Sequence, residues 1–131
     1  MTQPAARLGD GVNGTDVHIV MVPTPTGPVP TPTPLPFSGT IVDGGSQNVL
    51  IGGQPAAVVG SGAVNNPPHV PTGGTFQVPP TNRGTVLKGS ATVLVNGKPA
   101  ARNGDPVLTC ADPAPTPNSV IRATGTVLIG G

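Results

Sequence analysis

The sequence predicts an all-β fold, a compact cone of three pseudo-threefold-related β-hairpin repeats in which the N- and C-termini together complete one repeat. Three observations support this prediction. A strand-and-turn pattern recurs at a fixed spacing, the two chain ends carry complementary halves of the same pattern, and no stretch has a helical period. With 20 Gly and 19 Pro in 131 residues, turns and extended segments are expected throughout.

Two complete copies of the repeat lie in the interior of the chain. Residues 45–61 read GSQNVLIGGQPAAVVGS and residues 89–105 read GSATVLVNGKPAARNGD, 44 positions later (99 − 55 = 44). Each copy has a short apolar run, a tight turn at Gly52-Gly53 or Asn96-Gly97, and then Pro-Ala-Ala. Such dipeptides between β-type runs predict a hairpin.

The third copy is divided between the chain ends. Its second half is PAARLGD at residues 4–10, and its first half is ATGTVLIGG at residues 123–131. A strand-turn unit divided in this way is complete only if the two ends meet in space. The sequence therefore predicts a fold that closes on itself.

The individual strands are expected where β-branched and apolar residues alternate between turn signals. After the extended segment 4–10, which turns at Gly9-Asp10, the predicted strands are 16–22, 37–42, 48–51, 85–88, 92–95, 119–121 and 126–129. Residues 75–78 are expected to be a loop with weak strand content, and residues 107–110 precede a proline-rich link. Residues 85–88 and 92–95 are expected to form a hairpin pair. Residues 23–36, PTPTGPVPTPTPLP, lack the N–H groups that a sheet ladder requires, so they predict an extended polyproline-like insertion on the surface.

Composition limits the chain to one domain, residues 1–131. Only Phe37 and Phe76 are aromatic, and a single cysteine cannot form an internal disulfide, so a metal or a partner subunit is expected to support the thin core. A net charge of +1 excludes a basic surface for nucleic acid. The first residues resemble no signal peptide, and no apolar run is long enough for a bilayer span, so synthesis in the cytoplasm without classical export is expected.

The candidates for chemistry are His18, His69 and Cys110, the only imidazoles and the only thiol. They follow the three Pro-Ala-Ala motifs by 14, 14 and 11 residues (18 − 4, 69 − 55 and 110 − 99). One donor from each repeat would converge on the pseudo-threefold axis. Imidazole nitrogen and thiolate sulfur are preferred by Zn²⁺, and Fe is an alternative. Asp16, Asp112, a backbone carbonyl or water could supply a fourth ligand.

Structural and catalytic roles are the alternatives to metal binding for these residues. A single histidine is usually a hydrogen-bonded residue, and a single cysteine is usually a small buried apolar one. A Cys-His hydrolase lacks an orienting third residue, so no catalytic residue is predicted. Asp10 and Asp105 are interpreted as turn residues, a role that Ser61 takes in the middle copy. Arg7 and Arg102 either pair with those carboxylates or contact a partner.

The recurrence of Pro-Ala-Ala-Arg at residues 4–7 and 99–102, together with the Gly-Ser-x-x-Val-Leu-x-x-Gly pattern, resembles the PAAR-repeat family. The resemblance covers nearly the whole chain. It implies a β-rich cone whose blunt base binds the trimeric β-helical (VgrG-like) spike of a contractile injection system, one tip per trimer. The sharp end would hold a metal bound by histidines and cysteine. Two departures are Val58, which replaces the motif arginine, and the presence of three obvious donors where four are common.

The function implied by this resemblance is non-enzymatic. The chain would cap the spike of a type VI-like or phage-tail-like particle and help to puncture the target membrane. It would assemble in the bacterial cytoplasm and then travel with the particle out of the cell or into the target. The alternative is an adaptor that attaches effector cargo to the spike through the proline-rich insertion at residues 23–36.

Overall fold

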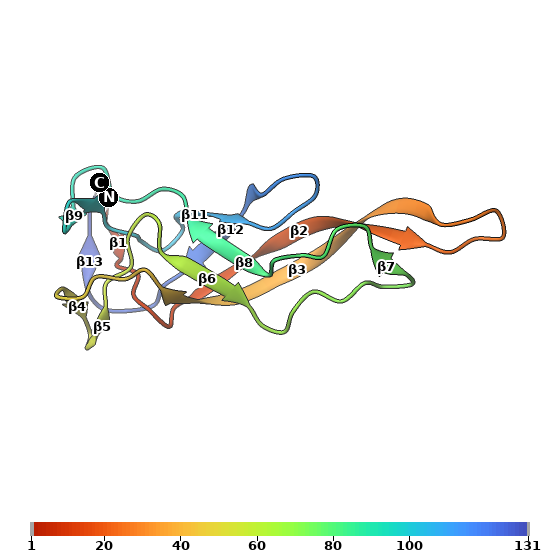
Figure 1. Cartoon of the computed structure of the whole chain (residues 1–131). Coiled ribbons are helices and arrows are strands. Elements are labelled where there is room, and N and C mark those ends of the chain that lie inside the picture. The colour runs from red at the N-terminus through yellow and green to blue at the C-terminus, as the bar shows by residue number, and fades with distance from the viewer. Residues whose placement is uncertain (1, 131) are drawn as a thin grey trace.

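The computed structural model describes residues 2–130 and consists of strands and turns throughout that range (Figure 1). No helix among these residues could cross a membrane. The strands are β1 (Gln3–Pro4), β2 (Gly11–Val22), β3 (Val29–Asp43), β4 (Leu50–Ile51), β5 (Gln54–Pro55), β6 (Gly62–Asn65), β7 (Thr75–Phe76), β8 (Arg83–Val86), β9 (Leu94–Val95), β10 (Lys98–Pro99), β11 (Pro106–Thr109), β12 (Thr116–Arg122) and β13 (Leu128–Ile129). The predicted all-β class is confirmed.

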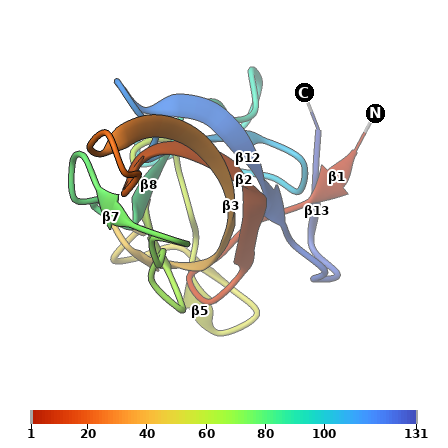
Figure 2. The same ribbon diagram turned by 90° about the vertical axis from the view of Figure 1, so that its right-hand side faces the viewer.

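Six strands form a closed barrel in the order β12-β11-β8-β6-β3-β2, and pairing of β2 with β12 closes it (Figure 2). The barrel is made of three hairpin-like pairs, β2–β3, β6–β8 and β11–β12. Closure leaves no unpaired edge around the ring. Its interior is filled by buried apolar side chains, the largest of which are Phe37, Ile41 and Ile121.

Three short two-stranded sheets lie at one end of the barrel: β4–β5, β9–β10 and β1–β13 (Figure 1). We call this end the base. In the third sheet Gln3 pairs with Ile129 and Pro4 with Leu128, so the first and last strands meet as predicted. Gly131, the last residue of the divided repeat, lies outside the described residues.

The motif alanines make the pseudo-threefold symmetry explicit. The N–H of Ala6 donates to the carbonyl of Ala101 at 2.9 Å, that of Ala101 to Ala57 at 3.0 Å, and that of Ala57 to Ala6 at 3.0 Å. This closed ring of bonds requires small side chains, and all three alanines are buried. After each motif the chain turns at a glycine with positive φ, 97° at Gly9, 96° at Gly60 and 85° at Gly104, which a side chain would disfavour.

One of the predicted pairings is wrong. Residues 85–88 do not pair with 92–95: β8 pairs with β6 and β11 in the barrel, whereas β9 pairs with β10 in the base. The two apolar runs are similar in sequence, but Leu94–Val95 forms a hairpin across the Asn96-Gly97 turn with Lys98–Pro99, which leaves Arg83–Val86 to pair in the barrel. Sequence proximity was therefore a poor guide to pairing.

The proline-rich segment was also predicted to stay out of the sheet, but Val29–Asp43 is a continuous strand that pairs with β2 from Val22↔Val29 to Gly11↔Thr40. The physical reason is the spacing of the prolines. Pro30, Pro32, Pro34 and Pro36 occupy alternate positions, so the intervening residues keep the N–H groups that bond β2. We call residues 15–36 the arm, and Figure 1 shows it extending from the barrel at the end opposite the base.

Candidate metal centre

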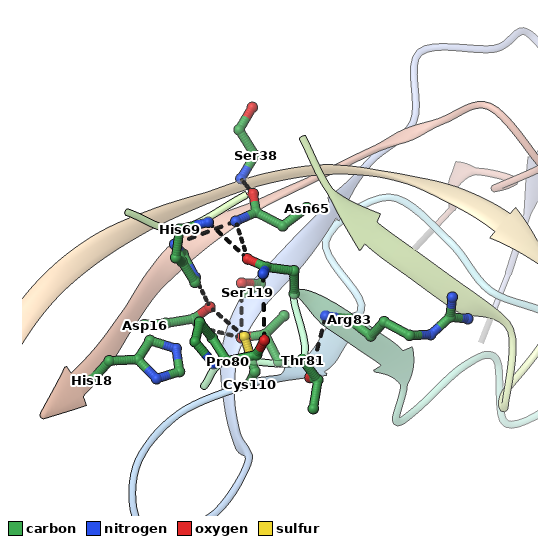
Figure 3. A network of polar contacts seen from close by, with 12 residues as sticks. Asp16, His18, Ser38, Asn65, His69, Pro80, Thr81, Arg83, Cys110 and Ser119 are labelled. Atoms are coloured by element: carbon green, nitrogen blue, oxygen red, sulfur yellow. Dashed lines mark hydrogen bonds and ion pairs between the residues drawn. The ribbon is translucent and has the colours of Figure 1, made fainter. Parts of the chain in front are cut away.

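Two of the candidate ligands lie on the inner face of β2. Asp16 and His18 are two residues apart on this strand, so their side chains share one face, and both are buried. Cys110 follows directly after β11, and His69 lies in the loop after β6. All three sequence-predicted donors thus come from different repeats and meet where the arm leaves the barrel (Figure 3).

Ligand atoms of Asp16, His18, His69 and Cys110 lie within 4.8 Å of one another. Asp16 was only one of several candidates for a fourth donor, and the structure places it at the centre. Its Oδ2 lies 2.8 Å from His69 Nε2 and 3.5 Å from Cys110 Sγ, while its Oδ1 accepts a hydrogen bond from Thr109 Oγ1 at 2.5 Å. Asp112 lies further out, with its Oδ2 3.5 Å from His18 Nδ1.

The three predicted donors do not occupy equivalent backbone positions. His18 lies within a strand, His69 in a loop and Cys110 at a strand end. The pseudo-threefold symmetry therefore holds in the base and at the start of each barrel strand. It does not extend to the backbone positions of the three donors. The equal offset of the two histidines from their motifs was a useful signal for their convergence, although their local structures differ.

Asparagine side chains hold His69 in one orientation. The Oδ1 of Asn65 accepts the N–H of Ser38 at 2.9 Å, which turns its Nδ2 toward His69 Nδ1 at 3.3 Å. His69 Nδ1 is therefore the acceptor, and Nε2–H donates to Asp16. Asn82 Oδ1 also accepts the backbone N–H of His69 at 2.8 Å. Neither asparagine was predicted, because only the fold brings them beside the imidazole.

The ring of His18, unlike that of His69, makes no hydrogen bond. Both of its ring nitrogens are buried without a hydrogen-bond partner, and its ring packs beside His69 and Phe76 with centroid distances of 5.0 and 5.8 Å. Buried polar atoms are almost always satisfied in folded proteins. An unsatisfied imidazole beside a buried carboxylate is the arrangement expected of a ligand whose partner is a cation.

The thiol of Cys110 is not activated in the metal-free site. Burial and the negative charge of Asp16 raise its pKa to about 11. At neutral pH the sulfur is therefore protonated and a poor nucleophile. A bound cation would reverse this, because coordination deprotonates a thiol.

The donor set fits a metal ion. Two imidazoles, one sulfur and one carboxylate oxygen are the ligand types that tetrahedral Zn²⁺ accepts, and iron accepts them as well. The unsatisfied nitrogens of His18 and the wholly buried carboxylate of Asp16 would both be compensated by a cation. Asp16, His18, His69 and Cys110 would hold the ion, which would cross-link three repeats.

The turn residues have the structural role that their positions predicted. The N–H of Arg7 donates to Asp10 Oδ2 at 2.9 Å and that of Arg102 to Asp105 Oδ2 at 2.7 Å, while in the middle repeat Val58 N–H donates to Ser61 Oγ at 3.0 Å. The Arg102 guanidinium also pairs with Asp105 at 2.9 Å. These groups lie toward the base and take no part in the metal centre.

A family model described as PAAR motif matches residues 76–131 of the chain. The matched part contains the Pro-Ala-Ala-Arg of residues 99–102 and the donor Cys110, and it ends with the strand that meets β1. No curated protein matches the chain. The family match, the closed barrel and the ring of motif alanines agree with the resemblance that the sequence predicted.

Proposed function

Because this chain is a PAAR-repeat protein, we propose that it is the non-enzymatic, metal-stapled tip that caps a trimeric β-helical spike of a contractile injection system. One observation carries the proposal: the base presents three equivalent apolar contacts around a pseudo-threefold axis. A partner with true threefold symmetry offers three identical contacts in return. One copy of the chain can then cover the end of one trimer.

The three contacts are leucines at the same place in each base sheet. Leu50, Leu94 and Leu128 are 59%, 60% and 57% exposed, and each pairs with the proline that begins a motif: Pro55, Pro99 and Pro4. Single exposed leucines are common on protein surfaces, but three at symmetry-equivalent positions are not explained by chance exposure. Burying them beneath a trimer would give an interface with an apolar centre.

The triple variant Leu50→Asp, Leu94→Asp and Leu128→Asp tests this contact. The side chains are exposed, so the variant should keep the wild-type melting temperature but lose co-purification with a trimeric β-helical spike. Val70→Asp is the matched control, because Val70 is 68% exposed and lies outside the base. Native mass spectrometry of the wild-type complex should give one copy per trimer. Undiminished spike binding by the triple variant would contradict the proposal.

The metal staple supports the same function. The four donors come from β2, the loop after β6, and the end of β11, so an ion there would fasten three repeats together. A tip driven through a membrane must resist local unfolding, and a bound structural metal provides such resistance. Elemental analysis should give about one Zn²⁺ per chain, with Fe as the alternative, and a melting temperature unchanged by chelation would contradict the staple.

Membrane puncture and localisation follow from the same role. The tip would assemble with the spike in the bacterial cytoplasm and then leave with the particle, either a type VI-like or a phage-tail-like one. Particles carrying Cys110→Ala tips should assemble but penetrate target cells poorly. Equal killing of target cells by both particles would reject the role in puncture.

A second candidate, an adaptor for effector cargo, is favoured by the projection of the arm away from the base (Figure 1). A partner could bind the arm while the base remains on the spike. Replacing the arm tip, residues 23–28, by a short turn should then abolish cargo loading without affecting spike binding. Normal loading with the shortened arm would reject the adaptor.

A further inference from the structure

The outer edge of β3 in the arm carries an unusual set of residues. β3 pairs with β2 along one edge, and no strand within residues 2–130 pairs with its other edge between Pro30 and Pro36. Four exposed prolines recur there at every second position: Pro30, Pro32, Pro34 and Pro36. We call these four residues the proline edge.

The direction of the backbone groups can be read from neighbouring bonds. The carbonyl of Ile19 accepts the N–H of Gln77 at 2.9 Å, and the carbonyl of Val17 accepts the N–H of Asp112 at 2.9 Å, so both point away from β3. Ile19 is opposite Pro32 and Val17 is opposite Pro34. The prolines therefore occupy the positions of the ladder at which the two strands exchange no hydrogen bonds.

Ser38 shows where the backbone groups of the even-numbered residues of β3 point. Its N–H donates to Asn65 Oδ1 at 2.9 Å and its carbonyl accepts the N–H of Asn66 at 3.0 Å, both on the side away from β2. Pro30 to Pro36 share this parity, so their carbonyls point outward and their nitrogens carry no hydrogen. The outer edge therefore accepts hydrogen bonds and donates none.

We propose that the proline edge closes the arm to strand addition and thereby prevents the arms of two copies of this chain from pairing edge to edge. An added strand needs donors as well as acceptors from the strand that it joins, and proline removes every donor on this edge. The intervening Thr31, Thr33 and Leu35 still donate to β2, so the arm stays ordered. The alternation thus gives a strand that pairs on one edge only.

The neighbouring strand explains why such protection matters. Residues 17–22, VHIVMV, combine β-branched and apolar side chains with neither proline nor permanent charge, a composition that favours intermolecular β-pairing. The outer edge of β2 is covered by β7 at Val20 and Met21, and by Asp112, whose Oδ2 accepts the N–H of Ile19 at 2.8 Å. The edge of β3 is the remaining place where the arm sheet could grow.

The double variant Pro32→Thr, Pro34→Thr restores two outward donors without altering the residues that bond β2. Analytical ultracentrifugation should show that the wild type remains monomeric while the double variant doubles its mass as concentration rises. The matched control is Pro25→Thr, Pro79→Thr, the same change at two exposed prolines outside the strands, and it should stay monomeric. A monomeric Pro32→Thr, Pro34→Thr variant would overturn the proposal.

Hydrogen exchange provides a second measurement on the same variant. In dilute solution the amides introduced at positions 32 and 34 should exchange rapidly, while those of Thr31 and Thr33 stay protected by β2. With rising concentration the two new amides should become protected as the dimer forms. Protection of both amides in dilute monomer would place them inside the β2 ladder and would also overturn the proposal. Neither measurement depends on spike binding or metal content.

Discussion

Asp16 Oδ2 accepts a hydrogen bond of 2.8 Å from His69 Nε2, and neither side chain is accessible to water. The contact joins β2 to the loop after β6 at the point where the four candidate ligands meet. In the metal-free site the imidazole proton partly balances the buried carboxylate. A metal ion would replace that proton, so the same pair is central to stability with or without the ion.

Replacing the carboxylate should therefore lower both metal content and stability. Asp16→Asn removes the charge of a candidate ligand and one of the two carboxylate oxygens that accept from Thr109 and His69, and loss of a hydrogen bond to a charged group costs about 1.5–3 kcal/mol. Elemental analysis and thermal unfolding measure the two effects. Asp43→Asn, which affects only an exposed pair with Arg83, should change neither. Full metal loading of Asp16→Asn would show that Asp16 is not a ligand.

The two histidines should respond differently to replacement by an apolar ring. In chelated protein His18→Phe should cost little or increase stability, because neither ring nitrogen of His18 makes a hydrogen bond. His69→Phe should destabilise the same protein, because it leaves Asp16 and Asn65 without their bonds. Both variants should bind less metal, as judged by titration. Equal destabilisation by the two variants in chelated protein would contradict this assignment.

The raised pKa of Cys110 predicts a loss of stability at alkaline pH in the metal-free protein. The pKa is about 11 in the folded chain against an ordinary value of 9.0, so above pH 9 the unfolded chain releases the thiol proton first. The free energy of unfolding should fall between about pH 9 and 11 more steeply for wild type than for Cys110→Ala. Denaturant titrations across this range measure the difference, and parallel curves for the two proteins would refute the prediction.

In the turn of the middle repeat, replacing Ser61 by the aspartate of the other two repeats should lower the free energy of unfolding. Ser61 Oγ accepts the N–H of Val58 and donates to the carbonyl of Gly44, both at 3.0 Å, and Ser61 is fully buried. Ser61→Ala should cost about 1–3 kcal/mol because the carbonyl and the N–H lose their partner. Ser61→Asp matches the other two repeats, yet it should cost more, because a carboxylate cannot donate to Gly44.

Chemical denaturation of both Ser61 variants measures these costs. Ser38→Ala is the control, since the exposed hydroxyl of Ser38 makes no hydrogen bond among residues 2–130. A Ser61→Asp protein as stable as wild type would show that the turn tolerates a second acceptor beside Gly44.

Much of the strand pairing and turn structure of the base could be predicted from the sequence. The repeat at residues 45–61 and 89–105, with its halves at the chain ends, predicted that β1 and β13 would meet, and they pair as expected. The motif alanines are informative because only a small residue allows three backbones to bond around one axis. The turn roles of Asp10 and Asp105 were also evident, since such side chains bond the backbone within a few residues.

The sequence by itself determined the all-β class and the closure of the chain on itself, because repeats and turns act over short distances, and it predicted that His18, His69 and Cys110 would converge. Only the tertiary structure decided the centre of the site, since Asp16 reaches His69 and Cys110 across 53 and 94 residues. It also decided that alternate prolines could join a strand. The prolines are tolerated because the pairing register directs the N–H groups of the intervening residues toward β2. Composition alone does not specify this register.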